Sequence, residues 1–162
     1  MVNQPLVKRN LKIPYANMRR LYRVKSLNKA KDGGTVSFGL KSKEKILTGQ
    51  TIGAFKGKKV SYKEMLRRQE LGLGGYTLGL LGTHNYLDCY VEAKSTPIKC
   101  LLSMANTANN LYAPNLERHL TSKDNNCRVV ITTKTAILYA TEDIEAGTEI
   151  LWPYGTSYIM DF

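Results

Sequence analysis

The sequence lacks a long apolar segment. Its longest apolar stretch is residues 71–82, and five of those twelve residues are glycine. A helix needs roughly 20 consecutive apolar residues to span a bilayer, so this stretch is too short. The first fifteen residues, MVNQPLVKRNLKIPY, also lack the unbroken apolar segment of a secretory signal. We therefore expect a soluble, intracellular protein with no membrane partner.

Cysteine and histidine are scarce. The three cysteines, Cys89, Cys100 and Cys127, lie far apart and form no C-x-x-C pair. The two histidines, His84 and His119, have no partner at the spacing of metal ligands. This pattern predicts neither a disulfide framework nor a metal site. We expect each cysteine to be a small buried hydrophobic residue.

Acidic residues are few in the first part of the chain. Residues 1–70 hold 18 Lys and Arg against 4 Asp and Glu, a net charge of +14, whereas residues 71–162 hold 6 against 9, a net charge of −3. A basic half indicates a polyanionic partner, most often nucleic acid, and Arg19, Arg20 and Arg23 are our candidates for that contact. A solubilising charged surface explains the same excess equally well.

Length and composition predict one globular domain. The chain has 162 residues, of which 43% are hydrophobic and 23% charged. Residues 1–20 are expected to form a basic, irregular arm, and residues 21–162 the domain. Short β-like runs separated by glycine turns dominate, without a βαβ alternation or an internal repeat. The sequence therefore predicts a mainly β fold with short helices.

Local signals place the elements. Ser61, followed three residues later by Glu64, is a capping box that predicts a helix over 62–71, ended by Gly72. Residues 98–106 are apolar and favour a short helix, and residues 106–126, with six asparagines, a long loop. A turn is expected at 29–35. Strands are expected at 21–27, 36–40, 51–55, 76–81, 86–91, 128–133, 135–141 and 149–152.

Two segments of the second half carry a family resemblance. Residues 143–155 read DIEAGTEILWPYG, which resembles the D-I-x-A-G-E-E-[IL] … Y-G end of a SET domain, the lysine methyltransferase module. Residues 103–108, SMANTA, resemble the family's R-F-x-N-H-S signature, and Asn126-Cys127 resembles the N-C that follows it. Tyr86-Leu87-Asp88 is similar to the strand before that signature.

Further matches lie upstream, in family order. Phe38-Gly39-Leu40 resembles the G-x-G-[LVF] turn, and residues 46–57, ILTGQTIGAFKG, are similar to I-x-x-G-x-x-I-x-x-Y-x-G. Together the matches cover about residues 21–158. Because they occur in the right order at plausible spacings, the chain is identified as a member of the SET family.

The resemblance implies a fold of small curved sheets with a knot-like active site, formed where the segment similar to N-H-S crosses the segment that ends in Y-G. In such a site the S-adenosylmethionine cofactor enters one side of a narrow channel and the substrate lysine the other. Tyr154 would be the catalytic tyrosine. Cofactor contacts would come from Phe38, Gly39, Tyr76, Ser103, Met104, Asn106 and Thr107. The lysine channel would be walled by Phe55, Trp152 and Tyr158, although ordinary core packing explains these aromatic residues equally well.

The implied activity is S-adenosylmethionine-dependent N-methylation of a lysine on a histone or another basic protein, in the nucleus if the organism is eukaryotic. Direct displacement needs a neutral amine, and a free lysine has a pKa of about 10.4. A desolvating aromatic channel lowers that pKa, and alignment of the reacting atoms supplies much of the rate. Neither a metal nor an acid–base dyad is required.

Several positions depart from the family pattern. Ser37 replaces the first glycine of G-x-G, Ser103-Met104 replaces Arg-Phe, and Thr107-Ala108 replaces His-Ser. No cysteine-rich zinc segment follows the domain before Phe162, so another C-terminal element, or a second subunit in a homodimer, would close the channel. These departures leave an alternative open: a non-catalytic SET-like module that binds nucleic acid or a nucleosome through the basic half.

Overall fold

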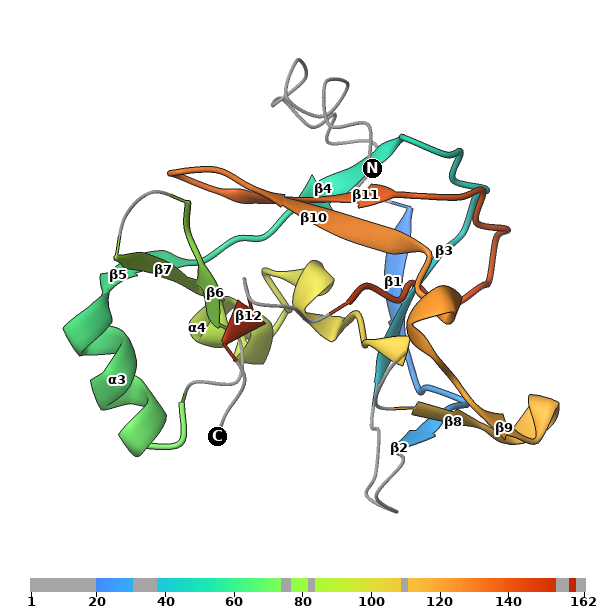
Figure 1. Ribbon diagram of the computed structural model, residues 1–162, viewed down its shortest axis with the longest axis horizontal. Coiled ribbons are helices and arrows are strands. Elements are labelled where there is room, and N and C mark those ends of the chain that lie inside the picture. Colours follow the sequence, from blue (N-terminus) through green and yellow to red (C-terminus); the bar gives the residue numbers. More distant parts are fainter. Residues whose placement is uncertain are drawn as a thin grey trace.

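The computed structural model describes residues 20–30, 38–73, 77–81, 84–108, 111–153 and 158–159. Within them, short strands form four small antiparallel sheets, arranged around a common centre (Figure 1). The sheets are β1 (Leu21–Val24) with β3 (Gly39–Ser42); β10 (Cys127–Ile131), β11 (Ala136–Ala140) and β4 (Thr51–Ala54); β12 (Tyr158–Ile159), β6 (Thr77–Gly79), β7 (Asn85–Asp88) and β5 (Lys58–Ser61); and β2 (Lys29–Ala30), β8 (Leu111–Ala113) and β9 (Arg118–His119).

The helices are short. Within the described residues, the α-helices are α3 (Tyr62–Glu70), beside the β5–β7 pair in Figure 1, and α4 (Tyr90–Lys94). Single 3₁₀ turns are η1 (Leu101–Met104), η3 (Pro114–Leu116) and η4 (Ser122–Asp124). A mainly β fold with short helices is therefore confirmed. No described helix has the length and apolar character that crossing a membrane requires.

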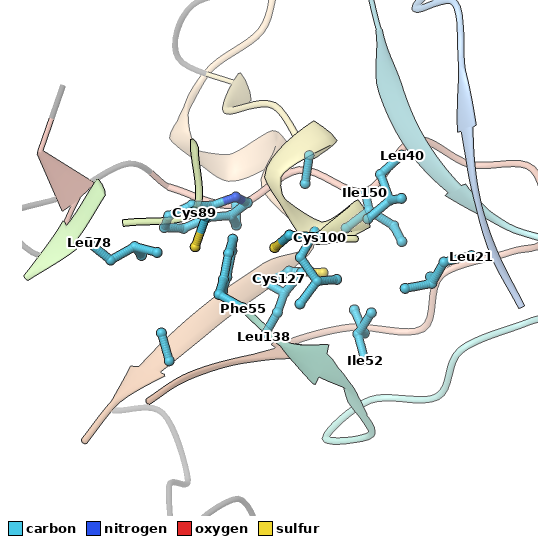
Figure 2. Packing of buried hydrophobic residues seen from close by; sticks show 14 of the residues in the cluster. Leu21, Leu40, Ile52, Phe55, Leu78, Cys89, Cys100, Cys127, Leu138 and Ile150 are labelled. Carbon is cyan, nitrogen blue, oxygen red and sulfur yellow. The ribbon is translucent and has the colours of Figure 1, made fainter. Parts of the chain in front are cut away.

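The main hydrophobic core joins three of the sheets. Figure 2 shows Phe55, Cys100 and Leu138 lying within it. Leu40 belongs to the β1–β3 sheet and Leu78 to the sheet of β12, β6, β7 and β5, so both sheets contribute to this core. The three cysteines are free and buried, as predicted. Burial raises the pKa of the Cys127 thiol, so this thiol stays neutral at physiological pH.

Local sequence signals placed α3 and the β10–β11 hairpin correctly. The Ser61 hydroxyl accepts a 3.2 Å hydrogen bond from the Glu64 N–H, and Gly72 follows the helix with a positive φ of 74°. The Glu64 carboxylate accepts from Arg67 and Arg68, and Arg68 also pairs with the buried carboxylate of Asp88. This ion pair fixes α3 against β7.

The asparagine-rich segment 106–126 is not a long loop. It contains β8, β9, η3 and η4, and β8 pairs with β2, which lies inside the predicted turn 29–35. The reason is an apolar cluster of its own, in which Leu111, Ala113 and Leu120 pack against Ala108 and Leu151. The many asparagines around these apolar residues made the segment look like a loop in the sequence.

Three further expectations on secondary structure differ from the structure. Residues 90–91 belong to α4 rather than to a strand, because the Asp88 carboxylate accepts the Tyr90 N–H at 2.9 Å and turns the chain out of β7. The helix expected over 98–106 shrinks to the four residues of η1. The strand expected at 149–152 makes only isolated bridges, Lys41 with Glu149 and Asn106 with Leu151.

Candidate active site

Residues 149–152 pass through the middle of the site and are held from three sides. The Ile150 N–H donates to the Leu40 carbonyl at 2.8 Å, and the Trp152 N–H donates to the Asn106 carbonyl at 3.0 Å. From the third side, the buried Asn126 side chain donates to the Glu149 carbonyl at 3.0 Å and accepts the Leu151 N–H at 2.9 Å. The two family-like segments, 103–108 and 143–155, therefore meet where the sequence predicts that they cross.

Asn106 lies at this crossing with its side chain fixed. Its Nδ2 donates to the Phe38 carbonyl at 2.8 Å and to Glu149 Oε1 at 2.9 Å. Both partners are acceptors, so the orientation of the amide is unambiguous and both Nδ2 hydrogens are used. No residue of the described ranges donates to Asn106 Oδ1, which leaves this oxygen as an acceptor for a ligand.

Glu149 is a functional candidate that sequence reasoning missed. Its Oε2 accepts from Ser26 Oγ at 2.9 Å and from Asn28 Nδ2 at 2.8 Å, while Oε1 accepts from Asn106. Among the described residues, no cation pairs with this carboxylate. It is therefore a fixed negative charge, held by neutral donors, beside the one free acceptor of Asn106.

The Glu149 carboxylate leaves no room for a side chain at Gly39. A Cβ built on Gly39 would lie 2.5 Å from Glu149 Oε1, closer than any real contact. Because three hydrogen bonds hold the carboxylate, it cannot move aside without losing partners. The structure thus explains Gly39 by a close approach of a side chain, whereas the sequence predicted an approach of cofactor.

A cavity of about 570 Å³ adjoins Phe38 and Met104, two of the predicted cofactor residues. The guanidinium of Arg23 lies 4.1 Å from the centre of the Phe38 ring, at cation–π distance. Arg23 forms no ion pair with any carboxylate in the part of the chain that the structure describes. The lining residues are Arg23, Phe38, Ala93, Lys94, Ser95, Thr96, Pro97, Ile98, Leu101 and Met104.

Two of the predicted channel residues pack against each other. The rings of Phe55 and Trp152 lie 5.5 Å apart at 60°, and both side chains are buried. This packing is consistent with a channel wall and with ordinary core packing, so their role stays a prediction. Tyr158 pairs through its backbone with Leu78, in the β12–β6 ladder.

The Ser103 side chain is hydrogen-bonded within the protein, and the Thr107 side chain is buried. The Ser103 hydroxyl donates to Cys100 Sγ at 3.2 Å, and the Lys56 N–H donates to the same sulfur at 3.3 Å. A hydrogen bond with Cys89, together with these two donors, lowers the pKa of Cys100 from its ordinary value despite its burial. Thr107 is buried. Both positions depart from the family pattern, and their predicted cofactor role stays a prediction.

Of the remaining predicted residues, Arg20 lies within the described ranges. Arg20 pairs with Glu44 at 3.3 Å. Tyr154, Tyr76 and Arg19 lie outside the described residues, as does the expected arm up to residue 19. The described residues contain no group of three or more His, Cys, Asp or Glu side chains that could hold a metal ion.

A comparison with family models matches the SET domain over residues 37–155. The chain therefore belongs to the SET domain family, as the sequence motifs predicted. A comparison with curated protein sequences gave no match.

Solved structures show the same fold. The Polycomb Repressive Complex 2 of Chaetomium thermophilum bound to GSK126 aligns with a TM-score of 0.60 at 21% identity, covering 85% of this chain and 16% of that chain. An autoinhibited form of ctPRC2 bound to S-adenosylmethionine gives 0.59 at 20%, covering 85% and 15%. A ctPRC2 complex with H3K27me3 and H3K27M gives 0.59 at 22%, covering 83% and 14%. The chain thus spans only about a sixth of these much longer chains.

Proposed function

We propose that this chain is an S-adenosylmethionine-dependent protein-lysine N-methyltransferase that acts on a histone or another basic protein. The observation that carries the proposal is the crossing of the two family segments, where the Asn106 side chain bonds to the Glu149 carboxylate and to the backbone of Phe38, a residue that lines the cavity. A histone substrate is supported by the H3K27-containing complex among the similar structures. A nuclear location, if the organism is eukaryotic, belongs to the same proposal.

The residues of the site fit the cofactor. Its amino-acid end carries an ammonium and a carboxylate. Asn106 Oδ1 and the uncompensated Glu149 would accept from the ammonium, and Arg23 would bind the carboxylate as a charge-assisted donor. Apolar and hydroxyl side chains line the adjoining cavity, which suits a nucleoside. The chemistry that S-adenosylmethionine supplies when bound is a methyl group on a sulfonium cation.

The remaining residues would prepare the substrate lysine. Phe55 and Trp152 exclude water from their side of the site, and desolvation lowers the pKa of an amine, so the lysine loses its proton more readily. The Tyr154 hydroxyl would then orient the neutral amine. Holding the amine in line with the methyl group would accelerate the transfer through proximity and orientation.

Incubation of the chain with labelled S-adenosylmethionine and a panel of histones and basic peptides tests the proposal. We expect label on lysine side chains, located by mass spectrometry. Binding of the cofactor without labelling of any substrate in the panel would favour the non-catalytic alternative instead.

A substitution at Arg23 tests its role at the cavity. We expect Arg23→Met to weaken binding of S-adenosylhomocysteine about 10-fold, because a charge-assisted hydrogen bond to the carboxylate is lost. Binding of 5′-methylthioadenosine, which has no amino-acid end, should not change. Lys25→Met removes the same charge from an exposed position outside the cavity and should leave both affinities as they are. Equal S-adenosylhomocysteine affinity in wild type and Arg23→Met would remove Arg23 from the site.

The nucleic-acid role of Arg19, Arg20 and Arg23 and the homodimer stay predictions. The Arg20–Glu44 ion pair gives Arg20 a partner within the fold, so its charge is less available to a polyanion than the sequence indicated.

A further inference from the structure

Four exposed lysines lie within eight residues, 56–63. Lys56, Lys58, Lys59 and Lys63 are all exposed. None of the four forms an ion pair with a residue that the structure describes. They belong to β5, to the two residues before it and to the start of α3, and we refer to them as the β5 lysines.

The carboxylates nearest to this segment in the fold are engaged elsewhere. Lys58 stands opposite Asp88 in the β5–β7 ladder, but the Asp88 carboxylate is buried and pairs with Arg68. Glu64, in the first turn of α3, accepts from Arg67 and Arg68. The arginines of α3 thus neutralise the local acids, and the positive charge of the β5 lysines remains uncompensated.

The geometry of β5 spreads these cations over both faces of a sheet edge. β5 is the edge strand of its sheet and is bonded only to β7 (Figure 1). Lys58 and Lys59 are consecutive, so their side chains leave the strand on opposite faces. The four residues of β5 extend over about 10 Å, a length along which duplex DNA presents about six phosphate charges.

An aromatic side chain adjoins the lysines. Tyr62 is 50% exposed, and its ring lies 6.1 Å from that of Tyr86. An exposed tyrosine between lysines offers a face on which an unpaired base can stack. Cations next to an aromatic face are characteristic of nucleic-acid contacts rather than of contacts with acidic proteins.

We propose that the β5 lysines bind the phosphate backbone of a nucleic acid. The surface begins one residue after Phe55, which packs on Trp152 at the candidate active site. Nucleic acid bound there would lie close to the site, so a basic protein carried on that nucleic acid would be presented to it. Lysines also protect an edge strand from pairing with another chain, and the experiment must separate these two roles.

Fluorescence anisotropy with a labelled 20-base-pair DNA duplex and the corresponding single strand, at several salt concentrations, tests the proposal. We expect the variant K58Q/K59Q/K63Q to bind both forms at least 10-fold more weakly at low salt. Each lost phosphate contact should lower the slope of log affinity against log salt by about 0.9 for the duplex. Binding does not require methyl transfer, so this result is independent of the proposed enzyme activity.

The matched control is K25Q/K43Q/K134Q, which removes the same charge from exposed lysines scattered over other parts of the fold. It should keep most of the affinity and of the slope. An equal loss in both triple variants would mean that net charge alone acts, and an unchanged slope in K58Q/K59Q/K63Q would mean that the lysines only protect the edge. Displacement of the duplex by polyglutamate at an equal charge concentration would favour an acidic protein partner and overturn the proposal.

Discussion

Replacing Tyr154 by Phe should leave the chain folded and remove most of its methyl transfer. The substitution keeps the ring and deletes only the hydroxyl that the family resemblance assigns to orientation of the amine. Loss of one positioned hydrogen-bonding group at a reacting centre typically costs about 10²-fold or more in kcat. A radiolabelled-methyl assay, with the thermal midpoint measured in parallel, checks both halves of this expectation.

Tyr112→Phe is the matched control for this prediction. Tyr112 lies in β8 and packs edge-on against His119, in the sheet that does not contribute to the Asn106–Glu149 group. Its hydroxyl should be dispensable, so activity should stay at the wild-type level. Full activity in Tyr154→Phe, with the cofactor still bound, would show that the catalytic assignment is wrong.

Glu149→Ala should have the second large effect, on cofactor affinity and on stability together. The carboxylate accepts from Ser26, Asn28 and Asn106, and removing it leaves three donors without that partner. Leaving partly buried donors unsatisfied costs about 1–3 kcal/mol each, less where water replaces the lost acceptor. Asn106 would also lose the contact that fixes its amide. We expect the Kd for S-adenosylmethionine to rise more than 10-fold and the Tm to fall.

Two companion variants separate a local effect from a general one. Glu145 lies in the same segment, and among the described residues its carboxylate pairs only with the exposed Lys45. Glu145→Ala should therefore change neither quantity by much. Gly39→Ala drives a methyl group against Glu149 Oε1 and should reproduce the loss of affinity with the carboxylate still present. Wild-type cofactor affinity in both Glu149→Ala and Gly39→Ala would contradict the role of this cluster.

Local signals and ordered motifs predicted much of the fold. The Ser61 cap, the β10–β11 hairpin and the meeting of Asn106 with residues 151–152 depend on nearby residues or on ordered motifs, and these predictions were confirmed. The β2–β8 pairing was missed, since it joins residues some 80 positions apart and the asparagines of 106–126 concealed its apolar residues.

The site was predictable only in part for the same physical reason. Asn106 and Phe38 belong to motifs, so the sequence indicated both, and the structure joins them by a hydrogen bond. Glu149 acquires its importance from Ser26 and Asn28, more than 120 residues away, and no local pattern reports such a contact. Arg23 was assigned to nucleic acid by charge alone, and only the fold places it over Phe38 at the cavity.

Isothermal titration of the chain with S-adenosylmethionine tests the central claim most directly. We expect saturable binding at one site per chain, and binding of S-adenosylhomocysteine at that same site. Absence of binding at millimolar cofactor, by a chain whose circular dichroism shows a folded β protein, would contradict it.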